Sequence, residues 1–96
     1  MAVVMEQDVP GLTPDQYDRV VEVMNLEGDP PKGGLIHIAR FDDSGLHVTD
    51  VWESQEDFER FAQERLGPAI QEVTGGAGPP PQSRFTEAHN YFAPGT

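Results

Sequence analysis

The apolar pattern at the start of the chain predicts a strand followed by a helix. Residues 2–9 are apolar and β-branched at first and then alternate with polar residues, which is typical of a β-strand. Thr13, Pro14 and Gln16 then have the features of a helix start: a capping hydroxyl, a proline at the first helical position, and a glutamine that completes a capping box. Apolar side chains follow at helical spacing, so we expect one buried stripe made of Tyr17, Val20, Val21 and Met24.

The centre of the chain predicts a β-hairpin. After a loop over residues 28–34 that is rich in glycine and proline, residues 35–41 and 46–53 have the character of two strands, joined by a type I turn from Asp42 to Gly45. Because side chains alternate between the faces of a strand, pairing across that turn fixes which residues share a face. The predicted pairs on one face are Phe41 with Leu46, Ala39 with Val48, His37 with Asp50, and Leu35 with Trp52.

The last part of the chain predicts a second helical region and a fourth strand. Ser54 is expected to cap a helix, and Gly67–Pro68 is expected to break it before a short helix resumes. Residues 74–83 are rich in glycine and proline and form a predicted connector. Residues 84–92 are the predicted fourth strand, and residues 93–96 are a tail. The apolar stripe expected along the two helical pieces is Phe58, Phe61, Ala62, Leu66, Ala69, Ile70 and Val73.

The resulting order of elements, β-α-β-β-α-β, predicts a ferredoxin-like α+β fold in a single domain over residues 1–96. In that plan both helices lie on one face of a four-stranded antiparallel sheet, so the other face is bare. A bare sheet face exposes apolar side chains unless something covers it. For a chain of 96 residues, the simplest cover is a second copy, so we expect a homodimer.

Charge and composition exclude several classes of protein. Six Lys and Arg stand against seventeen Asp and Glu, a formal net charge of −11, which disfavours binding to nucleic acid or to an anionic membrane surface. The absence of cysteine removes disulfides, thiolate catalysis and Cys-ligated metals. No apolar run approaches a membrane span and the N-terminus lacks a signal-peptide pattern, so we expect a cytoplasmic protein.

The sharpest candidate for chemistry is the pair formed by His37 and Asp50. The predicted hairpin register places them directly opposite each other beside Trp52, where opposed Cβ atoms lie about 5 Å apart. A carboxylate at that distance fixes the tautomer of an imidazole and makes it a base, able to accept a proton from a phenol or from a carbon beside a carbonyl. The alternative is a buried pair whose only role is structural.

Other polar residues add weaker candidates. His89 and Tyr91 share a face of the predicted fourth strand and would stabilise an oxyanion there, unless they pack at a subunit contact instead. Tyr17 either lines the pocket or packs in the core with its hydroxyl at the surface. His47, on the opposite face of the hairpin, is expected to be solvated. No spacing of His and carboxylate residues supports a metal site, and we expect no cofactor.

Several of these features resemble one known superfamily. The helix entry Gly11–Pro14 and above all the stretch Asp50–Phe58, with the sequence DVWESQEDF, are similar to the dimeric α+β barrel proteins on the antibiotic-biosynthesis-monooxygenase side. The resemblance covers nearly the whole chain. It implies the ferredoxin-like fold, dimerisation, and a pocket between sheet and helices, lined by Trp52 and Phe58. Activities within the superfamily include cofactor-free oxygenation, haem degradation, polyketide cyclisation and isomerisation.

The chain departs from the residue patterns of two of those activities. Val48 stands where the quinone-forming oxygenases carry an asparagine, four residues before the tryptophan. Phe61 stands where the haem degraders carry a tryptophan, and no histidine follows before His89. The resemblance therefore implies a fold more firmly than a reaction.

Two hypotheses of different kinds follow. The first is a cofactor-independent enzyme that acts by proton abstraction on a small apolar or aromatic molecule, as a monooxygenase, cyclase or isomerase. In it His37 is the base, Asp50 orients it, and His89 assists, while the substrate lies against Leu35, Trp52, Phe58, Tyr17 and Tyr91. The second is a non-catalytic, ligand-binding or stress-associated dimer with a structural His–Asp pair.

Overall fold

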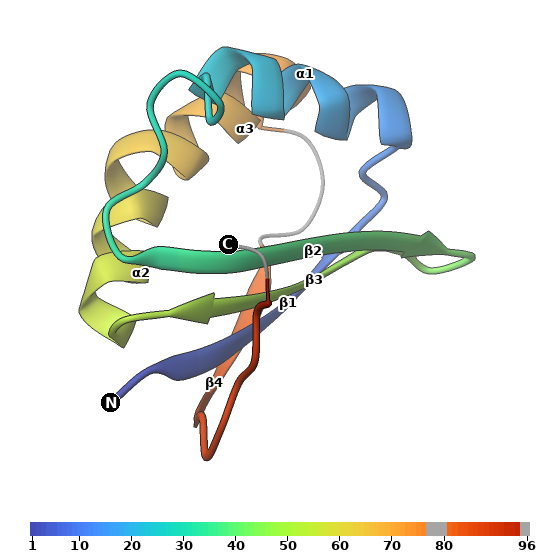
Figure 1. Cartoon of the computed structure of the whole chain (residues 1–96). Helices are drawn as coiled ribbons and strands as arrows, with labels where there is room; N and C mark the ends of the chain where they lie inside the picture. The colour runs from blue at the N-terminus through green and yellow to red at the C-terminus, as the bar shows by residue number, and fades with distance from the viewer. Residues whose placement is uncertain (77–80, 95–96) are drawn as a thin grey trace.

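The computed structural model describes residues 1–76 and 81–94 (Figure 1). Most of that part of the chain lies in four strands and two helical regions. The first helical region is a single helix after the first strand, and the second consists of three helical segments joined end to end. Their bounds are β1 Val3–Pro10, α1 Pro14–Met24, β2 Gly34–Asp42, β3 Gly45–Trp52, α2 Gln55–Phe61, a π-helical turn η1 Ala62–Leu66, α3 Gly67–Thr74 and β4 Gln82–Glu87.

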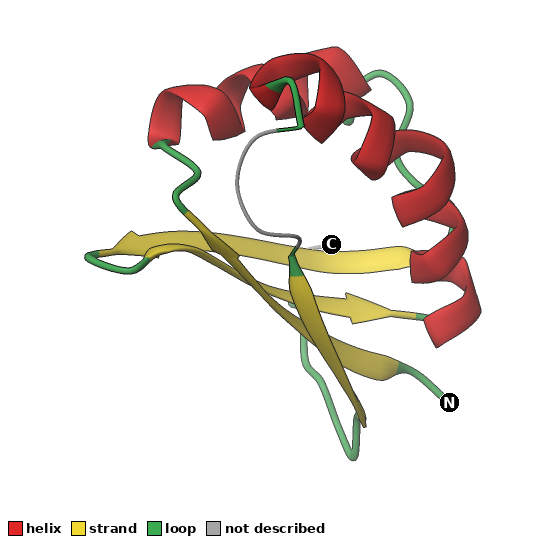
Figure 2. Ribbon diagram, turned by 180° about the vertical axis from the view of Figure 1, so that it is seen from behind, coloured by secondary structure: helices red, strands yellow, loops and turns green. Residues whose placement is uncertain are grey.

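The four strands form one antiparallel sheet in the order β2-β3-β1-β4. All the helices lie on the same face of that sheet and leave the other face bare, as the views from the front and from behind both show (Figures 1 and 2). This is the ferredoxin-like plan that the order of elements predicted, and the prediction is confirmed. The helical face of the sheet is referred to below as the inner face, and the bare one as the outer face.

Helix α1 begins as its sequence predicted. The Thr13 hydroxyl accepts the backbone N–H of Gln16 at 3.2 Å, and the Gln16 side-chain oxygen accepts the backbone N–H of Thr13 at 3.0 Å. These reciprocal bonds satisfy two backbone donors that a helix start otherwise leaves without partners. The helix ends at Asn25, in the left-handed conformation, and Val20 is its buried residue.

The predicted break at Gly67–Pro68 is wrong, because the helix continues through it. The turn before the proline widens into a π-helix over Ala62–Leu66, and the Gly67 N–H donates to the carbonyl of Ala62, five residues back. Proline has no N–H and its ring collides with the carbonyl four residues earlier in a regular α-helix. The wider π-helical turn moves that carbonyl away from the proline ring, so α3 continues directly from η1 with no loop between them.

The fourth strand is shorter than predicted and begins earlier. It spans Gln82–Glu87 instead of residues 84–92, so the predicted connector over residues 74–83 overlaps the end of α3 and the start of β4, and its residues 77–80 lie outside the described chain. β4 pairs only with β1, and Glu87 lies opposite Val3. One more hydrogen bond follows, from the Ala88 N–H to the Ala2 carbonyl, which precedes the first residue of β1. The strand therefore ends before His89.

The hairpin register is confirmed at three of its four predicted pairs, including His37 with Asp50. The fourth is wrong: Gly34, not Leu35, lies opposite Trp52, because the register shifts by one residue between Gly34 and Ile36. A Cβ added at Gly34 would lie 3.6 Å from the Trp52 ring and 3.2 Å from the Pro31 ring. A side chain at this position would thus press on Pro31, while its contact with the indole would be an ordinary one. The main buried cluster comprises Met5, Val9, Leu12, Leu46, Val48, Trp52 and Phe58.

Replacement of the α1 cap provides a test of this local stability. We expect Thr13→Ala to lower the free energy of unfolding in urea by about 1 kcal/mol, because the substitution removes the acceptor for the Gln16 N–H. Thr13→Ser, which keeps the hydroxyl, should lie close to the wild type. Equal losses in both variants would mean that the methyl group of Thr13, and not its hydroxyl, contributes the stability.

Candidate functional site

A cavity of about 330 Å³ lies between the inner face of the sheet and the helices. The sheet contributes apolar side chains from β1 and β3, and the helices contribute aliphatic and aromatic ones from α1, α2, η1 and α3. Its predominantly apolar lining includes Met5, Val48, Val20, Phe61, Leu66 and Ile70. A space of this size and character is typical of sites that bind small organic molecules.

The His37–Asp50 pair opens on this cavity. Asp50 is 5% exposed, and His37 Nδ1 lies 2.7 Å from its Oδ1. The second carboxylate oxygen accepts the Trp52 indole N–H at 3.0 Å, so both oxygens of Asp50 have a donor. The side chain of His37 is 43% exposed, which places the imidazole at the edge of the cavity and the carboxylate inside it. The buried Asp50 carboxylate thus holds the His37 imidazole, a proton acceptor, at the edge of the cavity.

Tyr17 completes this polar cluster from the opposite layer. Its hydroxyl, carried by the first turn of α1, lies 2.6 Å from His37 Nε2, and the two rings are nearly parallel with centroids 6.1 Å apart. Phe41 packs edge-on against the phenol ring. The sequence predicted Tyr17 as a pocket residue but not its bond to His37. Both residues occupy inward-facing positions, and that shared orientation is the signal from which the bond could have been suspected.

The hydrogen bonds around His37 determine its tautomer. An ionised Asp50 can only accept, so Nδ1 carries the ring proton and donates it to the carboxylate. Nε2 then holds the lone pair and accepts the hydroxyl proton of Tyr17. Burial raises the pKa of the Tyr17 phenol, and the nearby negative charges of Asp50 and Asp18 raise it further. Tyr17 is therefore a neutral hydrogen-bond donor at physiological pH.

Aromatic residues form one end of the cavity. Trp52 is buried against Phe58, with centroids 5.5 Å apart, and against Phe61 at 5.3 Å. These three rings and Leu35 are among the lining residues, although the bulge leaves Leu35 partly exposed. Their edge-on and tilted packing gives this part of the site a fixed shape.

A second polar group in the cavity, Gln7, was not predicted. It is buried on the inner face of β1 and donates from Nε2 to the Ser83 hydroxyl of β4 at 3.1 Å. Alternation along β1 places Gln7 between Met5 and Val9 on the inward face, so its position was readable from the strand pattern. A buried glutamine among apolar residues supplies a directional polar contact within a mostly apolar space.

His89 and Tyr91 do not join this site within the described chain. Both follow the end of β4 and are exposed, and neither is among the residues that line the cavity. The strand on which their predicted roles depended ends at Glu87, because β1 offers no further pairing. The single chain therefore brings Tyr17, His37, Asp50 and Trp52 together and leaves His89 and Tyr91 apart from them.

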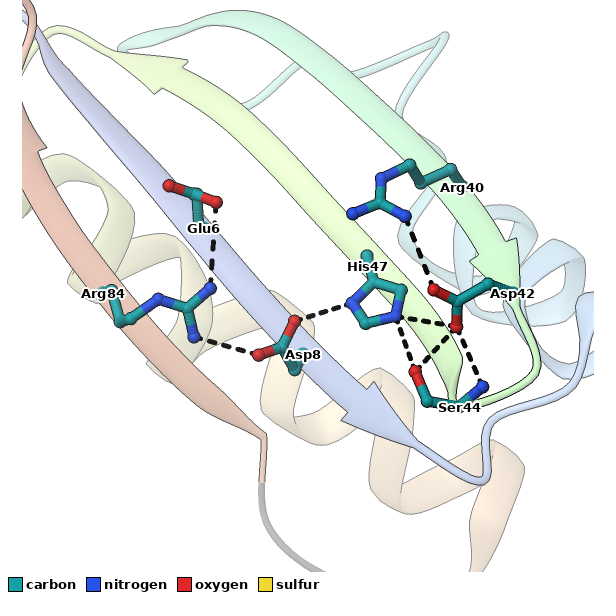
Figure 3. Close-up of polar contacts among 7 residues, drawn as sticks. All are labelled: Glu6, Asp8, Arg40, Asp42, Ser44, His47 and Arg84. Carbon is teal, nitrogen blue, oxygen red and sulfur yellow. Dashed lines mark hydrogen bonds and ion pairs between the residues drawn. The ribbon is translucent and has the colours of Figure 1, made fainter.

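The expectation that His47 is solvated is wrong. On the outer face of the sheet, His47 bridges two carboxylates: Nδ1 lies 2.7 Å from Asp8 and Nε2 lies 2.9 Å from Asp42 (Figure 3). The chain of contacts continues across all four strands, from Arg84 through Asp8 and His47 to Asp42 and Arg40. The outer face thus carries a polar ladder of alternating charge, made of Glu6, Asp8, Arg40, Asp42, Ser44, His47 and Arg84.

Within residues 1–76 and 81–94, no group of three or more His, Asp or Glu side chains is arranged to hold a metal ion. None of the helices in that part of the chain has both the length and the apolar character needed to span a membrane.

Comparison with known proteins identifies relatives by structure alone. No protein-family model matches the sequence, and no curated protein matches it either. Among solved structures, NE2512 from Nitrosomonas europaea, a protein of unknown function, has 14% identity, covers 99% of this chain and 95% of its own, and gives a TM-score of 0.70.

Two more of the matched structures carry information on function or assembly. A variant of SnoaB from Streptomyces nogalater, described as a cofactor-independent oxygenase, has 14% identity, covers 94% of each chain and gives a TM-score of 0.61. A dimeric ferredoxin-like protein of unknown function from Thermobifida fusca has 10% identity, covers 92% of each chain and gives a TM-score of 0.63.

These matches define the class of the fold. They include two proteins whose descriptions name an antibiotic biosynthesis monooxygenase, and these two cover 98% and 97% of this chain. The chain shares the ferredoxin-like fold of these solved structures. At these identities the likeness concerns the fold, which is compatible with many reactions.

The outer ladder makes the stability of the protein depend on pH. Hydrogen bonds to Asp8 and Asp42 raise the pKa of His47, so its contribution is present below about pH 6.5 and is lost as the pH rises through the raised value. The pKa of Asp42 is lowered, first by the Ser44 hydroxyl, and that of Asp8 is lowered, first by Arg84. Their contributions are present above about pH 4 and are lost as the pH falls.

His47→Gln should remove the loss of stability that occurs in the wild type when His47 loses its proton at rising pH. We expect the difference in unfolding free energy between wild type and variant to be larger at about pH 5 than at about pH 9, measured by urea denaturation. His89→Gln, at an exposed histidine, is the matched control and should show no such trend. A wild-type-minus-variant difference that is constant with pH would contradict a raised pKa of His47.

Proposed function

We propose that the protein is a cofactor-independent catalyst that removes a proton from a small apolar or aromatic molecule. His37 accepts the proton and Asp50 orients the imidazole and balances its charge. The observation that carries the proposal is the opening of a fully hydrogen-bonded His–Asp pair on an apolar cavity of about 330 Å³. Candidate substrates are phenols and compounds with a carbon–hydrogen bond beside a carbonyl.

The bonding of Asp50 suits this role. A protonated His37 bears a positive charge next to the carboxylate that already accepts its Nδ1–H, so the pair is neutral overall after proton transfer. The Trp52 N–H fixes the other carboxylate oxygen and prevents the side chain from rotating away. The geometry is present before a substrate binds, which reduces the reorganisation that accompanies the transfer.

Oxygenation, cyclisation and isomerisation can each begin with this step. Removal of a proton beside a carbonyl leaves an enolate, which is then attacked by dioxygen, closes a ring on a second carbonyl, or is protonated at another carbon. SnoaB, of the same fold, is described as a cofactor-independent oxygenase, which supports chemistry of this type on the fold. Val48, in place of the asparagine that the resemblance to the oxygenases implies, disfavours a simple copy of their reaction.

The active form in this proposal is a homodimer that covers the outer face of the sheet. Ile38 on that face is 53% exposed, and the matched protein from Thermobifida fusca is described as dimeric. Ile38 gains by removal from water, and the alternating charges of the ladder can pair with those of a second copy.

Deuterium exchange into aromatic ketones tests the catalytic proposal. We expect the wild type to accelerate exchange beside the carbonyl of α-tetralone, β-tetralone or an indanone over buffer, followed by proton NMR. His37→Gln should reduce the enzymatic rate by about 100-fold or more, since a positioned general base contributes about 10²–10⁴.

The control is a second histidine that pairs with an aspartate at the same distance. His47 lies 2.7 Å from Asp8 on the other face of the sheet. His47→Gln, assayed as the dimer that light scattering verifies, should leave the exchange rate unchanged. No acceleration by the wild type with any of these ketones would overturn the enzyme proposal, and tight binding of a ketone without exchange would favour the ligand-binding alternative.

The dimer is tested by charge placed on the outer face. We expect Ile38→Asp to convert a wild-type dimer into a monomer in light scattering at micromolar concentration, because an uncompensated charge would be buried at the interface. Val23→Asp is the matched control, since Val23 is 46% exposed but lies on α1. A monomeric wild type, or dissociation of both variants, would contradict the proposed interface.

A further inference from the structure

We propose that the Tyr17 hydroxyl is the group that takes the proton from the bound molecule, while it passes its own proton to His37. In this arrangement Tyr17 is the catalytic residue in contact with the substrate, and His37 and Asp50 act through it. The inference rests on the proposed function and assigns the position at which the substrate is deprotonated.

The first argument is that His37 has no acceptor left for a substrate. Its Nδ1 donates to Asp50 at 2.7 Å, and the lone pair on Nε2 accepts the Tyr17 hydroxyl at 2.6 Å. Neutral imidazole has one donor and one acceptor, so both positions are occupied. A substrate proton can reach Nε2 directly only after the bond to Tyr17 has broken.

The second argument is that the Tyr17 oxygen can still accept. A phenolic hydroxyl that donates one hydrogen bond retains lone pairs, and Tyr17 is among the residues that line the cavity. The ring is held by Phe41 on its edge and lies parallel to His37, so the oxygen has a defined position. The acceptor that faces a ligand in this part of the cavity is therefore the phenol oxygen.

The proton transfer balances without any other reactant. The carbon–hydrogen or oxygen–hydrogen bond of the substrate breaks, and its proton forms a bond to Tyr17 Oη. The proton that Tyr17 held moves to His37 Nε2 at the same time. The products are an enolate or phenolate, a neutral tyrosine, and an imidazolium paired with the Asp50 carboxylate. Reversal of the transfer, or loss of the proton from the exposed imidazole to water, restores the site.

The electrostatics favour transfer of both protons together. Burial, and after it the charges of Asp50 and Asp18, disfavour a negative phenolate at Tyr17, so a stepwise route through a free tyrosinate is costly. The same Asp50 charge favours a positive imidazolium at His37. Concerted movement avoids the disfavoured ion and creates the favoured one, and the short distance between Tyr17 Oη and His37 Nε2 suits such a transfer.

The competing explanation makes the opposite prediction. If Tyr17 only blocks His37, and the substrate must displace it, then removal of the hydroxyl frees Nε2 and increases the rate. If Tyr17 relays the proton, removal of the hydroxyl breaks the path and decreases the rate. Tyr17→Phe keeps the ring and its packing on Phe41, so the sign of its effect separates the two.

The experiment measures Tyr17→Phe in the same ketone exchange assay. We expect the maximal exchange rate to fall by about 100-fold while the Michaelis constant changes little, since the lost group acts in proton transfer. The ring nitrogens of His37, followed by nitrogen-15 NMR, should keep the Nδ1–H tautomer, because Asp50 still accepts that proton. A merely structural role would raise the Michaelis constant or disturb the tautomer.

The outcomes distinguish this inference from the proposed function. A rate for Tyr17→Phe equal to or above that of the wild type, with His37→Gln still inactive, overturns the relay and retains His37 as the base. Absence of exchange in the wild type overturns both. A loss in Tyr17→Phe with an unchanged rate in His37→Gln overturns the part in which His37 receives the proton.

Discussion

The buried carboxylate of Asp50 is the interaction on which the rest of the site depends. A carboxylate that is almost completely removed from water is costly unless donors satisfy it, and here His37 and Trp52 each donate to one oxygen. Those two bonds fix the direction of the imidazole, the position of the indole and, through His37, the bond to Tyr17. Through His37, the Asp50 carboxylate on β3 thus connects the sheet to Tyr17 of α1, and these residues form the polar part of an otherwise apolar cavity.

The two faces of the sheet use the same pair of residue types in opposite settings. On the inner face His37 bonds one buried carboxylate and leaves its other nitrogen to a phenol that lines the cavity. On the outer face His47 is held between two partly exposed carboxylates, and both of its nitrogens are occupied by them and by Ser44. The inner pair has a cavity beside it, which is why the chemistry is proposed there and not at the outer ladder.

Much of the fold could be predicted from local pattern. The order of elements, the α1 cap and the facing of His37 and Asp50 follow from alternation, helical spacing and the length of one turn, which are properties of neighbouring residues. The predictions that were wrong concern features that depend on contacts between distant parts of the chain. The end of β4 depends on where β1 begins, the Leu35 bulge on how β2 pairs with β3, and the continuous helix at Pro68 on a widened turn. The Tyr17–His37 bond depends on how α1 is rotated above the sheet, which sequence periodicity does not specify.

The π-helical turn also has a consequence for how the cavity is shaped. A π turn has the effect of one additional residue inserted into an α-helix, and one residue corresponds to about 100° of rotation. Ala62–Leu66 therefore sets the angle at which α3 presents its side chains relative to α2, and Ile70 faces the cavity together with Phe58 because of it. Deletion of a single residue in this turn would turn α3 about its axis and exchange the helical lining of the cavity, with the sheet and the polar part of the cavity unchanged. Change in chain length at one position is thus a route by which proteins of this fold can acquire new ligands.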